Sequence, residues 1–495
     1  MHKQDSVYKV NASAGLVSQR IFYIIVLASA LMAILFGLFA VTANPIIISL
    51  AIALVAGTIL LAKPDLIMWL VLSLGLLVVG ILPLHFDFIA SKAAWGVSLL
   101  GFFLMSIAFM GGVTSPNTLK DTPIFIWLAL GFLVYALLNS LIQWYSAGEF
   151  LGGFKRYFQV YGLMFAVCWI NFSERDIRRW QAFFLIVALL QLPFALYELI
   201  IFAPLLHSTW GVAAVDIVAG TFGSGKDGGG ANGEMALFLI IMLAFLLARY
   251  MEKMLSVAHL FLLMPFLLAP LFLGETKAVI VMLPLMFLVL YRHEIFIRLH
   301  HWLLGFIIAT MITVAAGYYY LSLSHVPIDQ QIETIIDYNF YERGYGKQHL
   351  NRTTVLTFWA EKQGAHDPIS FMFGNGLGSS HTNGGGHVAQ LYPAYGIGLT
   401  AVSTLLWDVG VFGFILFVFI LSFAWSCAAR LWRESVLPTV RADAIAIQAA
   451  LALFGFHLFY RGALLEIPTI QIVFAALLGY LAWLHRRHVA LTRSK

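Results

Sequence analysis

Apolar residues fill most of this chain in long runs, and short polar segments separate the runs. A helix needs roughly 20 apolar residues to cross the hydrocarbon layer of a membrane. Runs close to that length fall at about 21–40, 46–62, 66–84, 93–110, 122–142, 157–171, 180–202, 232–249, 257–273, 277–291, 302–321, 400–429, 443–460 and 465–484. The pattern predicts an all-α polytopic membrane protein with about 12 to 14 transmembrane helices. We expect the first run to be a retained helix, because no small-residue cleavage site follows it.

One long polar segment, residues 322–399, interrupts this pattern. It contains no apolar run long enough to cross the bilayer, so it must lie outside the hydrocarbon layer. The chain is thereby divided into an N-terminal membrane domain (1–321), a large loop (322–399) that we expect to cover an active-site cavity, and C-terminal membrane helices with a cytoplasmic tail (400–495). Within the loop, apolar positions at helical spacing predict short helices at 332–336 and 353–362.

Composition and charge agree with a membrane protein. The chain has 495 residues, of which 61% are hydrophobic and 11% are charged, whereas a soluble domain is about 25% charged. Most basic residues fall on one side of the predicted membrane, including those at 249–253, 430–441 and 486–495. Because cytoplasmic segments are enriched in lysine and arginine, both termini are predicted in the cytoplasm and the large loop outside. The net charge of +5 is then a topology signal, and we expect no nucleic-acid partner.

Ten cations lie on the predicted outer side, against the positive-inside bias. They are Lys92, Lys155, Arg156, Lys226, Lys277, Arg343, Lys347, Arg352, Lys362 and Arg461. A guanidinium group offers a two-pronged donor to phosphate oxygens, and its charge acts strongly near lipid. This favours binding of a phosphate-containing ligand at the outer face. The alternative is that these cations reach lipid headgroups or pair with Glu149, Asp227, Glu275 and Glu466.

Three motifs in the second half of the chain resemble one family. The run Gly274-Glu275-Thr276-Lys277-Ala278 opens a predicted span. Asn351-Arg352, followed by an amphipathic stretch with Trp359, leads through Pro368 to Gly374-Asn375-Gly376-Leu377-Gly378. The third motif is Leu405-Leu406-Trp407-Asp408-Val409-Gly410-Val411-Phe412-Gly413. Together they are similar to the O-antigen ligase and Wzy-type polymerase superfamily, with Lys277 where that family usually has arginine.

The resemblance implies a C-type glycosyltransferase membrane fold in the bacterial inner membrane, with the active site at the periplasmic face. It implies an undecaprenyl-pyrophosphate-linked glycan as donor, a glycan acceptor, membrane lipids as surroundings, and a flippase or chain-length regulator as pathway partner. Lys277 and Arg352 match the residues that hold the pyrophosphate, with Arg156, Arg343 and Arg461 as further candidates. Asp408 matches the family's acid. Fixed cations stabilise the leaving group, so we expect no metal and no cofactor.

The chain departs from the ligase pattern at one point. Ligases have a His-Asn pair where this chain has Leu399-Thr400. His381 and His387 are upstream in the same loop, and a histidine suits a general base near neutral pH. The departure favours a metal-independent polymerase that builds exopolysaccharide, capsule or O-antigen. The alternatives are an O-antigen ligase acting on lipid A core and a transporter or flippase of an anionic lipid-linked solute.

Overall fold

The computed structural model describes residues 63–205, 217–223, 230–297 and 350–493, except positions 86, 275 and 365, together with isolated residues at 27, 329, 330, 333 and 336. The chain divides into two compact units, Met1–Leu70 and Val71–Lys495. The runs predicted at 46–62 and 302–321, nearly all of the run at 21–40, and the candidate Arg343 lie outside the described residues. The candidate site described below belongs to the second unit.

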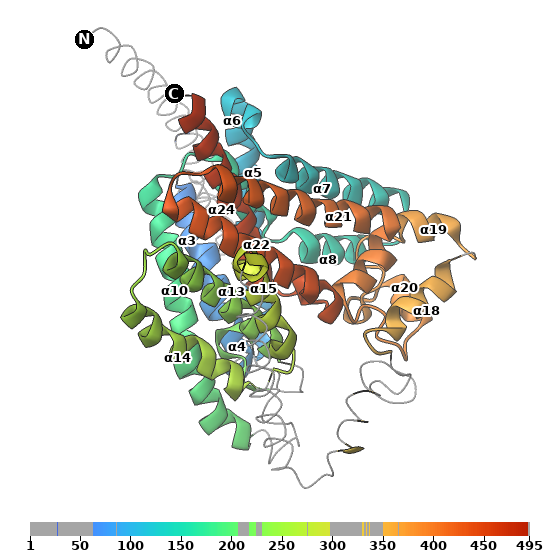
Figure 1. Ribbon diagram of the computed structural model, residues 1–495. Helices are drawn as coiled ribbons and strands as arrows, with labels where there is room; N and C mark the ends of the chain where they lie inside the picture. Colours follow the sequence, from blue (N-terminus) through green and yellow to red (C-terminus); the bar gives the residue numbers. More distant parts are fainter. Residues whose placement is uncertain are drawn as a thin grey trace. The chain divides into compact units, whose positions relative to one another are not determined.

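Helices make up all the regular structure of the described residues (Figure 1). By length and composition, eight apolar helices can cross a membrane: Pro64–Leu82, Ala93–Thr114, Ile124–Ile142, Glu174–Leu205, Asn232–Met251, Ala401–Glu434, Pro438–Tyr460 and Pro468–Arg493. Each lies on a predicted apolar run, which confirms that the described part of the chain is helical and contains several helices able to cross a membrane. Two further helices, α14 (Val257–Leu273) and α15 (Val279–Ile297), cover the runs at 257–273 and 277–291.

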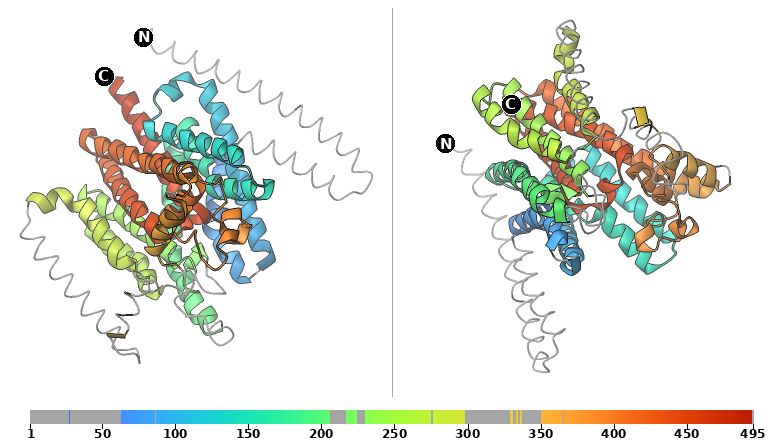
Figure 2. Two further views of the ribbon diagram at one scale, coloured as in Figure 1. Left: turned by 90° about the vertical axis from the view of Figure 1, so that its right-hand side faces the viewer. Right: turned by 90° about the horizontal axis from the view of Figure 1, so that it is seen from below.

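The second unit is a helix bundle (Figure 2). At its centre α21 (Ala401–Glu434) packs against α7 (Ile124–Ile142) and α22 (Pro438–Tyr460), and α22 packs against α13 (Asn232–Met251) and α15. On another side α9 (Tyr161–Trp169) packs against both α5 (Asp87–Thr114) and α24 (Pro468–Arg493). The helix α10 (Glu174–Tyr197) packs against α14.

The prediction of a single span at 157–171 is wrong. The chain forms α8 (Ala147–Phe158) and then α9, with a break at Gln159 and Val160. The Gln159 side chain accepts a hydrogen bond from Ser98 Oγ at 2.8 Å and donates one to Gln471 Oε1 at 2.6 Å. Next to it, a Cβ on Gly162 would lie 2.0 Å from the carbonyl oxygen of Gly101. Polar bonding and close backbone packing therefore hold the break in place.

Charged residues mark one end of the bundle. Arg249 on α13 contacts Asp443 on α22 at 3.0 Å, and Arg487 on α24 contacts Glu174 on α10 at 2.9 Å. Both arginines are among the basic residues that the sequence predicts to be cytoplasmic. At the opposite end of α21 lie short helices from the predicted loop, namely α18 (Thr354–Gln363), α19 (Pro368–Phe373) and α20 (His387–Leu391) (Figure 1). The helix predicted at 353–362 is thus confirmed.

Candidate functional site

A break in α21 receives the glycine-rich loop. Gly410 has φ 68° and ψ −174°, and a Cβ there would lie 2.5 Å from the backbone nitrogen of Gly374. Positive φ is accessible to glycine at little cost. The carbonyl oxygen of Trp407 accepts from Asn375 N at 2.9 Å, and that of Asp408 accepts from Gly376 N at 2.9 Å. The loop backbone thus satisfies carbonyl groups that the break removes from the helix.

The carboxylate of Asp408 organises the same loop. It is buried, and its Oδ1 accepts from Ser379 Oγ at 2.8 Å and from Ser380 N at 2.9 Å. Its Oδ2 accepts from Gly378 N and from the hydroxyl group of Tyr157, each at 3.1 Å. Four protein donors occupy the two oxygens. This geometry favours an anchoring role for Asp408 over direct contact with substrate.

Two glycines let the loop lie directly on α8. Gly378 has φ +87°, and a Cβ there would lie 2.7 Å from the carbonyl oxygen of Glu149. Opposite it, a Cβ on Gly153 would lie 2.4 Å from the carbonyl carbon of Leu377. Ser146 caps α8, since its hydroxyl accepts from Glu149 N at 3.2 Å. The close approach brings the end of the loop against the first turn of α8.

Glu149 and His387 meet at this contact. The carboxylate of Glu149 accepts from His387 N at 2.7 Å, and its oxygens lie 2.9 and 3.1 Å from His387 Nδ1. The imidazole ring also stacks on Tyr145, with 4.7 Å between ring centroids. The Glu149 side chain is 5% exposed and that of His387 is 26% exposed. The pair therefore presents an oriented histidine at an accessible surface.

The second candidate histidine lies beside a different acid. His381 Nδ1 is 3.6 Å from Glu466 Oε1. A Cβ on Gly384 would lie 2.9 Å from His381 Cδ2 and 3.2 Å from Arg156 Nη2, so both side chains border the same turn. Burial raises the pKa of Glu466, although the positive charge of Arg156 opposes the rise. Arg156, His381 and Glu466 thus form one polar group on the loop side of α8.

Two more candidate arginines surround the junction between α22 and the short helix α23 (Ala463–Glu466). Arg352 donates from Nε to the carbonyl oxygen of Tyr460 at 2.8 Å, and its guanidinium lies 4.4 Å from the centre of the Tyr460 ring. Arg461 donates from Nη1 to Gly230 O at 2.9 Å and to Glu234 Oε2 at 3.2 Å. Arg352 therefore binds Tyr460, and Arg461 is the next residue along the chain, five positions before Glu466.

Lys277 lies at the same end of the bundle. Lys277 is exposed and lies between α14 and α15. The turn before it is joined to the first residue of α13, because Asn232 Nδ2 donates to Gly274 O at 3.2 Å. Two positions further along α13 is Glu234, the partner of Arg461. The structure thus brings Arg156, Arg352, Arg461 and Lys277 to one end of the bundle.

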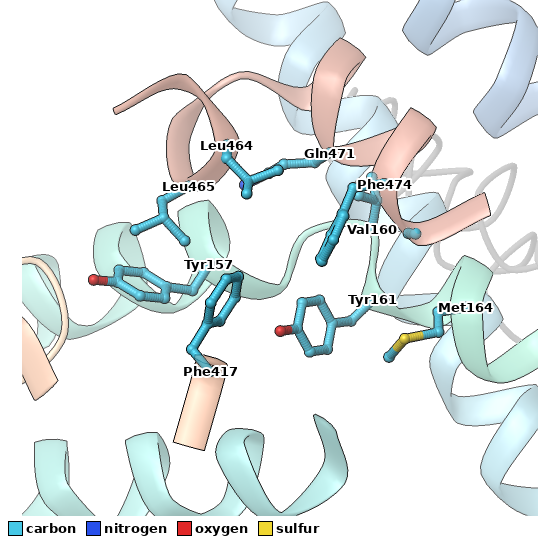
Figure 3. A pocket seen from close by; sticks show the side chains of 10 residues that line it. Tyr157, Val160, Tyr161, Met164, Phe417, Leu464, Leu465, Gln471 and Phe474 are labelled. Carbon is cyan, nitrogen blue, oxygen red and sulfur yellow. The ribbon is translucent and has the colours of Figure 1, made fainter. Parts of the chain in front are cut away.

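An apolar pocket adjoins this polar region (Figure 3). It is lined by Tyr157, Val160, Tyr161, Met164, Phe417, Leu464, Leu465, Gln471, Phe474 and Ala475. The rings of Tyr161, Phe417 and Phe474 gather around it in the figure. Tyr157 belongs to both regions, because its ring lines the pocket and its hydroxyl group binds Asp408. Among the described residues, no three histidine, cysteine or acidic side chains are grouped to hold a metal ion.

The acidic partners of the histidines are what sequence reasoning missed. The sequence indicates Glu149 and Glu466 only as acids close to cations. Glu149 instead binds His387, which is 238 positions away along the chain. Glu466 does lie within the electrostatic reach of Arg156, as the sequence alternative allows, and it also faces His381. A contact over 238 positions leaves no local pattern in one sequence.

Comparison with known proteins assigns no family to this chain. No protein-family model matches it, and no curated protein sequence matches it. The class of protein is therefore defined by the described helices: the regular structure of these residues is entirely helical, and eight of the helices are able to cross a membrane.

Proposed function

We propose that this protein is a membrane glycosyltransferase that joins undecaprenyl-pyrophosphate-linked oligosaccharide units into a polysaccharide at the periplasmic face of the bacterial inner membrane. The observation that carries the proposal is the contact of 2.9 Å between Glu149 and His387 at the bundle end that also holds Arg156, Arg352 and Arg461. An oriented basic nitrogen and several fixed cations are the groups that this transfer requires. Membrane-spanning helices beside them suit a lipid-linked substrate.

The reaction has one bond forming and one breaking at the anomeric carbon. The hydroxyl oxygen of the acceptor glycan attacks this carbon, while the bond to the pyrophosphate oxygen breaks and its electron pair leaves with undecaprenyl pyrophosphate. The hydroxyl proton passes to a histidine nitrogen. Guanidinium groups stabilise the negative charge that develops on the leaving group. Because arginines carry this charge, the proposal includes no metal ion.

The start of α21 supports polymerisation over ligation to lipid A core. The ligase His-Asn pair corresponds to Leu399 and Thr400 in this chain. Thr400 is buried, and its hydroxyl accepts from Ser403 N at 3.1 Å as the N-terminal cap of α21. Thr400 therefore caps α21, and its side chain is not a general base for the acceptor hydroxyl group. A general base must then come from another residue of the loop, which is what a chain without the His-Asn pair of the ligases requires.

The test is transfer by the purified protein in lipid nanodiscs that contain the undecaprenyl-pyrophosphate-linked glycan, without nucleotide sugar or added metal. We expect a ladder of glycan multiples on a gel, and a rate at least about 10-fold lower for Arg352→Ala, because single charge-stabilising donors often contribute more than that. Arg178→Ala is the matched control, since Arg178 is exposed and pairs with Glu174 near the opposite end.

Each other outcome contradicts a defined part of the proposal. Equal rates for the wild type and Arg352→Ala, with both proteins folded, would remove Arg352 from the pyrophosphate site. Transfer that occurs only when lipid A core is added would identify a ligase. No transfer with either acceptor would reject glycosyl transfer and favour movement of the lipid-linked glycan across the membrane, which a flipping assay in vesicles then measures.

A further inference from the structure

We infer that Glu149 is a positioning residue that selects His387, and not His381, as the base for the acceptor hydroxyl group. The inference rests on the proposed function, because a base is needed only where a hydroxyl group is activated. Glu149 would hold the proton of His387 on Nδ1 and direct Nε2 towards the acceptor. The acceptor is a sugar hydroxyl group of a lipid-linked glycan.

The geometry of the pair fixes one tautomer. A carboxylate only accepts hydrogen bonds, so a neutral imidazole must donate from Nδ1 to Glu149, at 2.9 Å. The lone pair is then on Nε2, which has no hydrogen-bond partner among the residues of the described ranges. The same carboxylate accepts from His387 N at 2.7 Å, so it holds both the backbone and the ring. Stacking on Tyr145 fixes the remaining ring rotation.

A purely structural role explains Glu149 less well. An acid in the first turn of a helix is favoured by the helix dipole, and Glu149 has that position in α8. Its carboxylate oxygens nevertheless bind His387 and not the free amide groups of α8. Burying a carboxylate is costly unless it is paired and hydrogen-bonded. The Glu149 side chain is 5% exposed, and the cost of burying it is offset by its bonds to His387, whose side chain is 26% exposed.

His381 lacks comparable support. Its Nδ1 lies 3.6 Å from Glu466 Oε1, beyond the range of a good hydrogen bond. The Glu466 side chain is also 36% exposed, whereas that of Glu149 is 5% exposed, so Glu466 is the less enclosed of the two acids. The structure therefore contains one histidine with an ordered ring and one whose orientation is not set by its acidic neighbour.

Steady-state kinetics on the same glycan substrate test the inference. Glu149→Ala is expected to lower kcat by about 100-fold, within the usual contribution of general base catalysis, with a much smaller change in KM for the donor. Glu149→Gln should lose less, because its amide oxygen still accepts from Nδ1. His387→Ala should lose at least as much as Glu149→Ala and regain activity with added imidazole. The control is Glu361→Gln, whose exposed carboxylate pairs with Lys362 in the same loop.

Nitrogen NMR of histidine-labelled protein supplies a readout that does not depend on turnover. The signal of His387, identified by its absence in His387→Ala, should report a proton on Nδ1 in the wild type and a shift towards Nε2 in Glu149→Ala. A wild-type proton on Nε2 would overturn the inference, as would full kcat in folded Glu149→Ala and Glu149→Gln, or loss of kcat in His381→Ala but not in His387→Ala. Where the wild type transfers glycan in those cases, the proposed function stands with a different base. A wild type that transfers no glycan overturns both.

Discussion

Replacement of Asp408 separates an anchoring role from a catalytic one. Its carboxylate accepts from two backbone amides, Gly378 N and Ser380 N, and from two hydroxyl groups. In Asp408→Ala the hydroxyl groups can turn to other acceptors, but the backbone amides cannot. Each buried donor left unpaired costs about 1–3 kcal/mol. We therefore expect a local loss of about 2–6 kcal/mol for Asp408→Ala.

Asp408→Asn should have about half of this effect. Each carboxylate oxygen of Asp408 accepts from one backbone amide. In either orientation of the asparagine side chain, its NH2 group therefore replaces one acceptor and faces Gly378 N or Ser380 N. The expected loss is about 1–3 kcal/mol, which corresponds to roughly 5- to 150-fold faster amide exchange in the loop, at tenfold per 1.4 kcal/mol.

Hydrogen exchange measured by mass spectrometry on peptides covering 374–380, in nanodiscs, is the assay, together with the transfer rate. Asp367→Asn is the matched control, because Asp367 caps only the short helix α19 by accepting from Ser370 N at 3.1 Å. If Asp408 is an anchor, exchange and activity change together. Loss of activity in Asp408→Asn with unchanged exchange would refute this reasoning and place Asp408 in the chemistry.

Two further predictions concern the packing and titration of the site. Gly153→Ala should destabilise the protein by about 1–3 kcal/mol through overpacking and lower its melting temperature. Gly152→Ala on the same helix should not, since a Cβ there meets nothing within 4 Å. Equal melting temperatures for the two variants would contradict the contact between the loop and α8. Burial raises the pKa of Glu466 above its ordinary value of 4.5, so the folded state holds this proton more tightly than the unfolded chain. The protonated Glu466 side chain therefore stabilises the fold fully below pH 4.5, and this stabilisation is lost as pH rises through the raised pKa. Glu466→Gln cannot lose a proton, so its melting temperature should fall less steeply than that of the wild type above pH 4.5. Equal slopes for the two proteins would contradict this prediction.

Much of the membrane architecture is predictable from the sequence because apolar length alone defines a span. The eight helices that can cross a membrane fall on predicted runs for this reason. The break after α8 is different. Gln159 is one polar residue within an apolar run, and its partners Ser98 and Gln471 come from distant parts of the chain. Only the fold shows that these three side chains meet.

The sequence predicts which types of residue belong to the candidate site, but it does not predict which residues pair with each other. The sequence singles out His387, Arg352 and Arg461 because they fall in predicted outer segments, and the structure places them at one end of the bundle. Which histidine is ordered depends on Glu149. Glu149 reaches His387 because the loop packs closely on α8. The glycines of the loop allow this close packing, but they do not reveal from the sequence which helix the loop contacts.

The break at Gly410 has a mechanical consequence. Asn375 and Gly376 donate from their backbone nitrogens to two carbonyl oxygens of α21, so two hydrogen bonds between main chains hold the base of the loop to this helix. The loop cannot swing open there as an independent lid. Under the proposed function, room for a lengthening glycan would come from bending of α21 at Gly410 or from movement of the loop beyond Ser380. A force on such a glycan would then be transmitted into the helix bundle.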